Sequence, residues 1–186
     1  PLTVDQQSLR QRLVDHVDVL AGQIGERHYL HPDKLQQAAD YIAKELQRTG
    51  YRVERQVFEP DGHHFENIHV TLTGTDLPEE SIVVGAHYDT VSGSPGADDN
   101  ASAVAVLIEL ARGLIGNQTG RSVRLVAFTN EEMPFGYGPF MGSRVYADWV
   151  SRQPGRVTGM IALEMLGFYA TAPGSQHYPF PMNYLY

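Results

Sequence analysis

The first half of the chain shows helix-like and strand-like spacing of hydrophobic residues in turn. Apolar side chains recur at helical spacing between residues 9 and 20 and again between 31 and 50, where Gly50 is placed to end the second helix. Residues 51–58 and 67–73 instead alternate polar and apolar positions, with a Pro-Asp-Gly turn between them. We expect these two segments to form an antiparallel pair at the edge of a sheet.

The second half contains apolar runs without alternation. Residues 82–86 are typical of a central strand that is covered on both faces, and 124–128 and 157–163 are predicted as further strands. A helix is expected over 101–114, and a shorter one is expected to begin near Ser143. Strands that alternate with helices predict an α/β fold with a mixed, largely parallel central sheet flanked by helices.

Composition narrows the class of protein. A chain of 186 residues with 42% hydrophobic and 19% charged residues is typical of one soluble globular domain, expected to span residues 1–186. The formal charge of −8 argues against a nucleic-acid surface, and the absence of cysteine excludes disulfides and thiolate metal sites. No apolar run reaches the ~20 residues that a membrane span needs. The start at Pro1 leaves the compartment open, with a lean to a secreted or periplasmic protein.

Two acidic motifs follow the central strand. His87 and Asp89 lie two residues apart, so their side chains leave the strand on the same side. This suits a histidine that binds a cation through one ring nitrogen while the aspartate holds the other. A glycine-bounded loop then brings Asp98 and Asp99 to the start of the next helix, where the Asp98 carboxylate could lie between two metal ions.

Glutamates follow the two later strands. Glu131 and Glu132 come after the strand at 124–128, and Glu164 ends the strand at 157–163. Because open parallel sheets bind ligands beyond the carboxyl ends of their strands, we expect these side chains to converge. A cation would relieve their repulsion, and a histidine with several carboxylates suits Zn²⁺, with Mn²⁺ and Co²⁺ as alternatives. Of the two adjacent glutamates, one can bind metal while the other takes a proton from water.

Each motif alone has a simpler explanation. The His-x-Asp pair could be a satisfied polar pair, the two aspartates could cap the helix, and adjacent glutamates are usually a solvated surface. Their order at three successive strand ends makes a shared cation site the better hypothesis. The six histidines that precede His87 in the chain are predicted to lie on surfaces or loops: His16, His28, His31, His63, His64 and His69.

Five segments together resemble the M28 family of zinc peptidases, which contains aminopeptidases, some carboxypeptidases and the related glutaminyl cyclases. They are residues 85–91, 96–102, 130–132, 141–143 and 163–167, and the resemblance covers the chain from about His16 onward. It implies a zinc-exopeptidase-like three-layer fold with one or two Zn²⁺ ions per chain. The implied metal ligands are His87, Asp98 as the bridge, Glu132 and Glu164. Glu131 would be the general base and Asp89 would orient His87.

The resemblance also implies details that can be checked. A cis peptide is expected between Asp98 and Asp99, Ala103 replaces a usual glycine, and Glu164 replaces a usual aspartate. The family's second zinc takes a histidine from a loop far beyond the counterpart of Glu164. Here only His177 follows, in surroundings unlike that motif. We therefore expect the natural ligand to lie beyond Tyr186 or to be lost, and the domain to be incomplete at its C-terminal end.

These observations predict a metal-dependent exopeptidase that acts on peptide or aminoacyl substrates. An aminopeptidase is favoured because acidic groups near the metal could receive a free α-amino group. The alternatives are a glutaminyl-cyclase-like acyltransferase and a non-catalytic protein with a peptidase fold. No nucleic-acid or membrane partner is expected, whereas an exposed apolar sheet edge would allow self-association.

Overall fold

The computed structural model describes residues 2–168 together with residues 170, 172 and 175. Its helices are α1 (Val4–Val17), α2 (Pro32–Arg48), α3 (Ala103–Leu114) and α4 (Gly142–Ser151). Its strands are β1 (Glu54–Phe58), β2 (Phe65–Leu72), β3 (Leu77–His87), β4 (Arg121–Phe128) and β5 (Arg156–Ala162). Helical turns at Asp18–Ile24 and Ala97–Ser102 extend α1 and precede α3. The predicted helices and strands are confirmed, with their ends shifted by a few residues.

The five strands form one sheet in the order β1-β2-β4-β3-β5. Strand β3 pairs in parallel with both β4 and β5, whereas β2 is antiparallel to β1 and β4. The predicted antiparallel pair at the sheet edge is therefore confirmed, and so is the mixed α/β sheet. Parallel pairing is confined to the three strands whose ends carry the candidate site.

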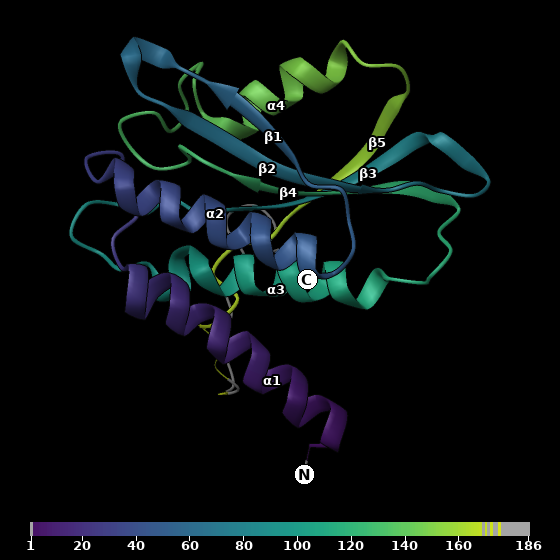
Figure 1. The fold of residues 1–186 in the computed structure, drawn as a ribbon, viewed down its shortest axis with the longest axis horizontal. Coiled ribbons are helices and arrows are strands. Elements are labelled where there is room, and N and C mark those ends of the chain that lie inside the picture. Colours follow the sequence, from purple (N-terminus) through teal and green to yellow (C-terminus); the bar gives the residue numbers. More distant parts are fainter. Residues whose placement is uncertain (1, 169, 171, 173–174, 176–186) are drawn as a thin grey trace.

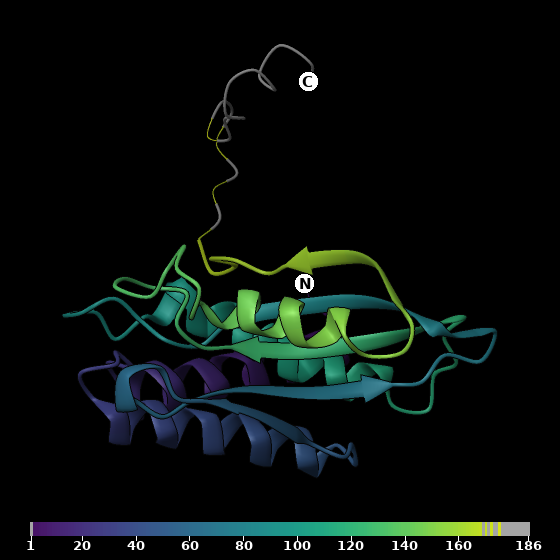
Figure 2. The same cartoon turned by 90° about the horizontal axis from the view of Figure 1, so that it is seen from above.

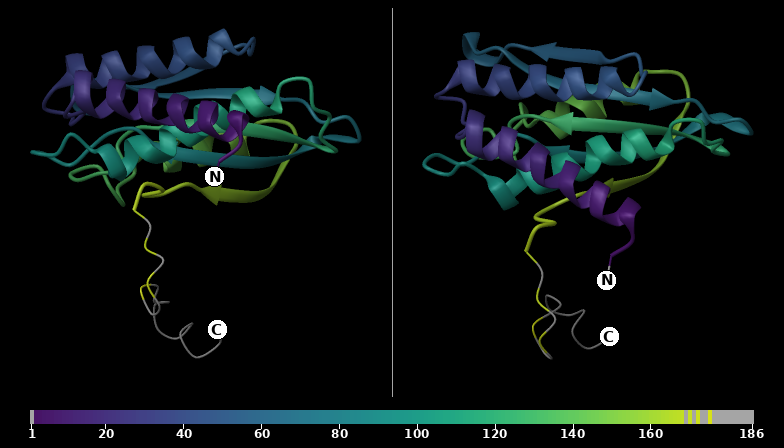
Figure 3. Two further views of the ribbon diagram at one scale, coloured as in Figure 1. Left: turned by 90° about the horizontal axis from the view of Figure 1, so that it is seen from below. Right: turned by 60° about the horizontal axis from the view of Figure 1, so that its bottom comes forward.

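Helices cover the sheet on both faces. Figure 1 shows α1, α2 and α3 on one face and α4 on the other, and Figure 3 shows α1 crossing α3 obliquely. The main core lies between the sheet and α2 and α3, where apolar side chains of both helices are buried: Leu35, Ile42, Leu46, Val104, Leu107 and Ile108. A smaller core lies under α4. None of the helices in the described ranges is long and apolar enough to cross a bilayer.

Strand β5 lies at an edge of the sheet, opposite β1 (Figure 2). All its residues are exposed, and Met160 and Ile161 are each 53% exposed on opposite faces of the strand. Within the described ranges, no further strand pairs with its outer side. This edge has the apolar character that the sequence predicted, and self-association through it stays a prediction.

Three of the histidines predicted to lie on surfaces or loops are buried, so the prediction is wrong for His16 and His69, whereas His28 does lie in a loop but is covered. His16 on α1 contacts Tyr41 and Glu109, and His28 lies against Tyr29. His69 on β2 is covered by aromatic rings of α4, and burial lowers its pKa. His16 and His69 are covered by elements far away in the chain, which local sequence patterns do not reveal.

The main core predicts different effects on stability for two isoleucines, one in the middle of α3 and one directly after its end. Ile108 is fully buried, whereas Ile115, directly after the helix, is 46% exposed. Ile108→Ala should lower the free energy of unfolding by about 2–5 kcal/mol, because it leaves a cavity. Ile115→Ala should change it by no more than about 0.5 kcal/mol. Urea unfolding of both variants measures the difference, and equal effects would contradict this packing.

Candidate metal centre

The parallel pairing of β4, β3 and β5 brings three strand ends to one edge of the sheet. His87 ends β3 and pairs with Phe128, the last residue of β4. Glu131 follows β4 and Glu164 follows β5 within a few residues. The Nε2 atom of His87 lies 3.5 Å from the Glu164 carboxylate and 3.9 Å from the Glu131 carboxylate. The structure therefore brings together the residues predicted at the three strand ends.

The two ring nitrogens of His87 face different partners. Nδ1 lies 3.2 Å from the main-chain oxygen of Asp89 and 3.5 Å from its carboxylate. Nε2 faces the acidic cluster and lies 3.1 Å from Oδ1 of Asp99. The imidazole is buried, so its orientation is restricted. This arrangement leaves Nε2 available to a cation while Asp89 holds the other nitrogen.

Asp89 also organises the loop after β4. One carboxylate oxygen accepts the main-chain N–H of Glu131 at 3.1 Å, and the other accepts that of Glu132 at 2.9 Å. The preceding residue, Asn130, has a φ of 57°, a left-handed conformation that turns the chain sharply toward the cluster. One buried carboxylate thus fixes both the histidine and the glutamate pair.

Asp99, and not Asp98, belongs to the cluster. Two groups of side chains offer ligand atoms within 4.8 Å of one another, His87 with Asp99 and Glu164, and His87 with Glu131 and Glu132. Asp98 instead accepts the main-chain N–H of Gly167 at 2.8 Å. The backbone leaves helical geometry at Asp99, with φ −100° and ψ 95°, which separates the directions of the two adjacent aspartates.

The expected cis peptide is also one residue away from its predicted place. The prediction of a cis bond between Asp98 and Asp99 is wrong, because the cis bond lies between Asp99 and Asn100. Both differences have one origin. The sequence presents two adjacent aspartates before a helix, and nothing in their spacing indicates which one follows the backbone turn into the cluster.

Asn100 is a site residue that the sequence reasoning missed. Its amide donates to the carbonyl of Leu163 at 3.0 Å and to the carboxylate of Glu164 at 3.2 Å, and its oxygen accepts the N–H of Met165. The amide therefore fixes the segment that carries Glu164. In the sequence, an asparagine that directly follows two aspartates was the one signal that could have identified this residue.

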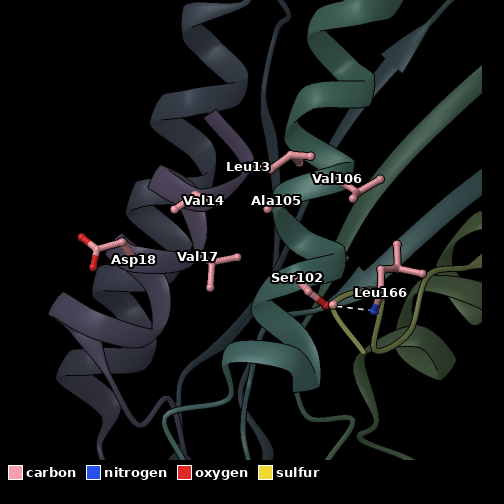
Figure 4. A pocket seen from close by; sticks show the side chains of 9 residues that line it. Leu13, Val14, Val17, Asp18, Ser102, Ala105, Val106 and Leu166 are labelled. Carbon is pink, nitrogen blue, oxygen red and sulfur yellow. Dashed lines mark hydrogen bonds between the residues drawn. The ribbon is translucent and has the colours of Figure 1, made fainter. Parts of the chain in front are cut away.

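Ser102 holds the same segment from the other side. Its hydroxyl accepts the main-chain N–H of Leu166 at 2.9 Å, a bond drawn in Figure 4, and donates to the Asp98 carbonyl at 2.7 Å. Figure 4 also shows the apolar groove of about 450 Å³ between α1 and α3 that this bond borders. Polar side chains of the turn before α3 thus attach the chain beyond β5 to the cluster.

The donor set fits a divalent cation such as Zn²⁺. All donors are imidazole nitrogen or carboxylate oxygen, and the chain contains no cysteine. Oδ1 of Asp99 is buried and faces Nε2 of His87 at 3.1 Å but makes no hydrogen bond, although a buried carboxylate oxygen is normally paired. A cation between this oxygen and His87 would supply the missing partner. His177, the weaker sequence candidate, lies outside the described residues.

A cavity of about 230 Å³ adjoins the cluster. His87, Glu131 and Glu164 line its polar side, and its other side is apolar, formed by Phe128, Met141, Met160 and Leu163. The site can therefore hold a small organic group next to the acidic cluster.

Comparison with known proteins assigns the family. The sequence model of peptidase family M28 matches residues 67–179, which include the whole cluster. The chain belongs to peptidase family M28. One curated relative is the uncharacterized protein YfbL of Escherichia coli (strain K12), which is 44% identical over 163 residues. That match covers 83% of this chain and 49% of the relative, so the chain spans about half the relative's length.

Other M28-like proteins have named activities. Aminopeptidase YwaD of Bacillus subtilis is 39% identical over 72 residues, which cover 39% of this chain and 15% of that protein. The solved structure of BSAP, a zinc aminopeptidase from Bacillus subtilis, has a TM-score of 0.72 at 14% identity, covering 83% of this chain and 69% of that one. Solved glutaminyl cyclases share the fold as well. These similarities confirm the zinc-exopeptidase fold.

The two adjacent aspartates provide a matched test of the cluster. Asp99→Asn should lower zinc affinity by more than the about 10- to 100-fold typical of losing a ligand's hydrogen-bond partner. Asp98→Asn keeps an oxygen that can accept the Gly167 N–H, so its effect should be smaller. Zinc titration against a chromophoric chelator measures both. A larger loss for Asp98→Asn would contradict the geometry described above.

Charge interactions in the cluster predict a pH dependence of the zinc-free M28 chain. Burial alone would lower the pKa of His87, but the hydrogen bond and charge of Asp89, with the charges of Glu164 and Glu131, raise it to about 9. Burial and the charge of Asp99 raise the pKa of Glu132 to about 7, and burial also raises that of Glu164. Each of these groups thus binds a proton more tightly in the folded state than its ordinary value implies.

The stability contributed by His87 is therefore complete below its ordinary pKa of 6.5 and is lost as the pH rises through about 9. The thermal midpoint of the zinc-free chain in EDTA should fall between these two pH values. The variant His87→Gln should show a smaller fall in the same window. A midpoint that stays constant or rises in the zinc-free chain would contradict the interactions assigned to His87.

Proposed function

We propose that this M28 chain carries the metal-binding and catalytic residues of a zinc-dependent exopeptidase that acts as an aminopeptidase. One observation carries the proposal. Asp99, Glu131 and Glu164 converge within 3.9 Å of His87 Nε2, around a buried Asp99 oxygen that has no hydrogen-bond partner. Such closely spaced carboxylates repel one another unless a cation lies between them.

His87, Asp99, Glu132 and Glu164 would hold the metal, so Asp99 takes the place first assigned to Asp98. These four residues fit one or two Zn²⁺ ions. A histidine for the second ion could come from His177 or from beyond Tyr186. Bound zinc would supply activation of a water nucleophile and polarisation of the substrate carbonyl. Asp89 keeps His87 in the tautomer that binds metal, as its contacts with Nδ1 allow.

Glu131 is assigned as the general base. Its carboxylate lines the cavity beside His87 and is 40% exposed, so it can reach a water in the cavity. The carboxylate would take the proton from the attacking water and then donate it to the leaving amine. The hydrogen bond from the Glu131 N–H to Asp89 holds this residue in place during both transfers.

The acidic cluster supports action at the amino terminus of a substrate. A protonated α-amino group is attracted by carboxylates that metal ligation leaves unneutralised, whereas a terminal carboxylate is repelled by them. The neighbouring cavity has an apolar side that suits an apolar side chain of the first residue. The names of the relatives YwaD and BSAP are consistent with this choice.

Glu131→Gln tests the proposed function against its alternatives. Hydrolysis of aminoacyl-anilides by the zinc-loaded chain should fall about 10²- to 10⁴-fold, the usual range for loss of an acid–base group. Bound zinc, measured by elemental analysis after desalting, should be unchanged. Glu79→Gln is the matched control, because Glu79 is exposed at the opposite end of β3.

Other outcomes identify the alternatives. Cyclisation of peptides with N-terminal glutamine, without release of free amino acids, would favour an acyltransferase that resembles glutaminyl cyclases. A folded chain that retains no zinc and has neither activity would indicate a non-catalytic protein with a peptidase fold. Full activity in Glu131→Gln would exclude Glu131 as the base.

A further inference from the structure

Arg27 is the largest side chain that is completely buried among the described residues, and it contacts no carboxylate directly. Its guanidinium donates hydrogen bonds of 2.7–3.0 Å to five main-chain carbonyls, those of Leu20, Gly25, Tyr88, Pro95 and Gly96. Burying a charge is expensive unless hydrogen bonds surround it, and here they do. The hydrogen bonds of the guanidinium are thus made to backbone carbonyls and not to a carboxylate.

These five carbonyls belong to three separate segments of the chain. Leu20 lies within the helical turn that follows α1, and Gly25 directly follows that turn. Tyr88 lies between His87 and Asp89, and Gly96 lies three residues before Asp99. A single guanidinium therefore ties the N-terminal segment to both ends of the loop that separates His87 from Asp99.

The loop packs tightly against the guanidinium. Gly96 has a φ of 58°, and a Cβ at this position would lie 2.9 Å from Nη2 of Arg27 and would also collide with Asp99 O and Thr90 Cγ2. Thr90 makes a second attachment, because its hydroxyl accepts the Arg27 N–H at 3.0 Å. The backbone before Asp99 is therefore packed closely against Arg27, and the hydrogen bonds to Pro95 and Gly96 resist its separation from the guanidinium.

The charge of Arg27 also acts on the cluster. Burial lowers the pKa of Arg27 to about 10, against the opposing effect of Asp89 and Asp99, so the side chain stays positive at neutral pH. Because its hydrogen-bond acceptors are all neutral, the acidic cluster supplies the compensating negative charge. An arginine suits this position better than a lysine, since it offers five N–H groups on three nitrogens to these five acceptors, with Nη1 shared among three of them, whereas a lysine offers only three.

We propose that Arg27 is a positioning residue of the metal centre, which fixes the loop between Tyr88 and Gly96 so that Asp99 meets His87. The part of the proposal that concerns zinc rests on the proposed function, whereas the ordering of the loop does not. Arg27 does not touch the metal or the substrate. It acts through the backbone that carries Asp89 and Asp99.

Two substitutions with matched controls test this role. Arg27→Lys keeps the charge but offers three donors, and Thr90→Val removes only the hydroxyl that accepts the Arg27 N–H. Thr90→Ser restores that hydroxyl. Arg112→Lys is the control for Arg27→Lys, because Arg112 bonds Glu109 near the far end of α3. The readouts are the zinc dissociation constant, from chelator competition, and hydrogen exchange of residues 88–99 in the zinc-free chain.

Arg27→Lys should raise the zinc dissociation constant about 10- to 100-fold and speed hydrogen exchange within residues 88–99. Thr90→Val should change both in the same direction, whereas Thr90→Ser and Arg112→Lys should leave both near wild type.

If Arg27→Lys does not fold, the comparison of Thr90→Val with Thr90→Ser tests the inference. Wild-type zinc affinity and exchange in the folded Arg27→Lys and Thr90→Val variants would overturn the inference while the proposed function stands. If the wild-type chain binds no zinc but the variants exchange faster, the proposed function fails and the ordering of the loop by Arg27 is upheld.

Discussion

Repulsion between carboxylates at one edge of the sheet is the constraint on which the rest of the site depends. Three carboxylates lie within 3.9 Å of a single imidazole nitrogen, and a fourth, Glu132, has a pKa raised to about 7. An arrangement of this kind persists only where positive charge or hydrogen-bond donors offset the repulsion. His87, the main-chain N–H groups on Asp89 and the buried Arg27 supply part of this compensation. A divalent cation would supply the rest, which is why the geometry favours a metal site over a solvated acidic patch.

The parallel register of the sheet determines which carboxylates meet. Gly85 pairs with Val126 on one side and with Ala162 on the other, so the three strands end at nearly the same level. Each chain segment then leaves the sheet within a few residues of His87. Because the strands stop together, short side chains and short loops are enough to bring residues that are far apart in sequence to one point. The amide of Asn100 and the hydroxyl of Ser102 then hold the last of these segments against the turn before α3.

The sequence predicted the parts of the site that depend on strand periodicity and residue type. His87, Glu131 and Glu164 follow apolar strands, and parallel strands necessarily bring their ends together. It did not distinguish Asp98 from Asp99, because the choice depends on a local departure from helical backbone geometry that either residue could precede. Arg27 and His16 carry no local signal at all. Arg27 bonds Tyr88, 61 residues away, and His16 bonds Glu109, 93 residues away, and no pattern of neighbouring residues encodes such contacts.

Those distant contacts explain why the N-terminal segment belongs to the site. In α1 the buried residue is His16, whose ring contacts Tyr41 of α2 at 2.6 Å and Glu109 of α3 at 3.2 Å. Arg12 bonds the same glutamate at 2.6 Å. Apolar burial alone attaches α1 weakly, since its apolar residues line an open groove against α3. The buried polar contacts of α1 give it a fixed position instead, because a displaced helix would leave the buried Glu109 with Arg112 but without Arg12 and His16. The turn after α1 then presents the carbonyls of Leu20 and Gly25 to Arg27, which connects the packing of the first helix to the loop that carries Asp99.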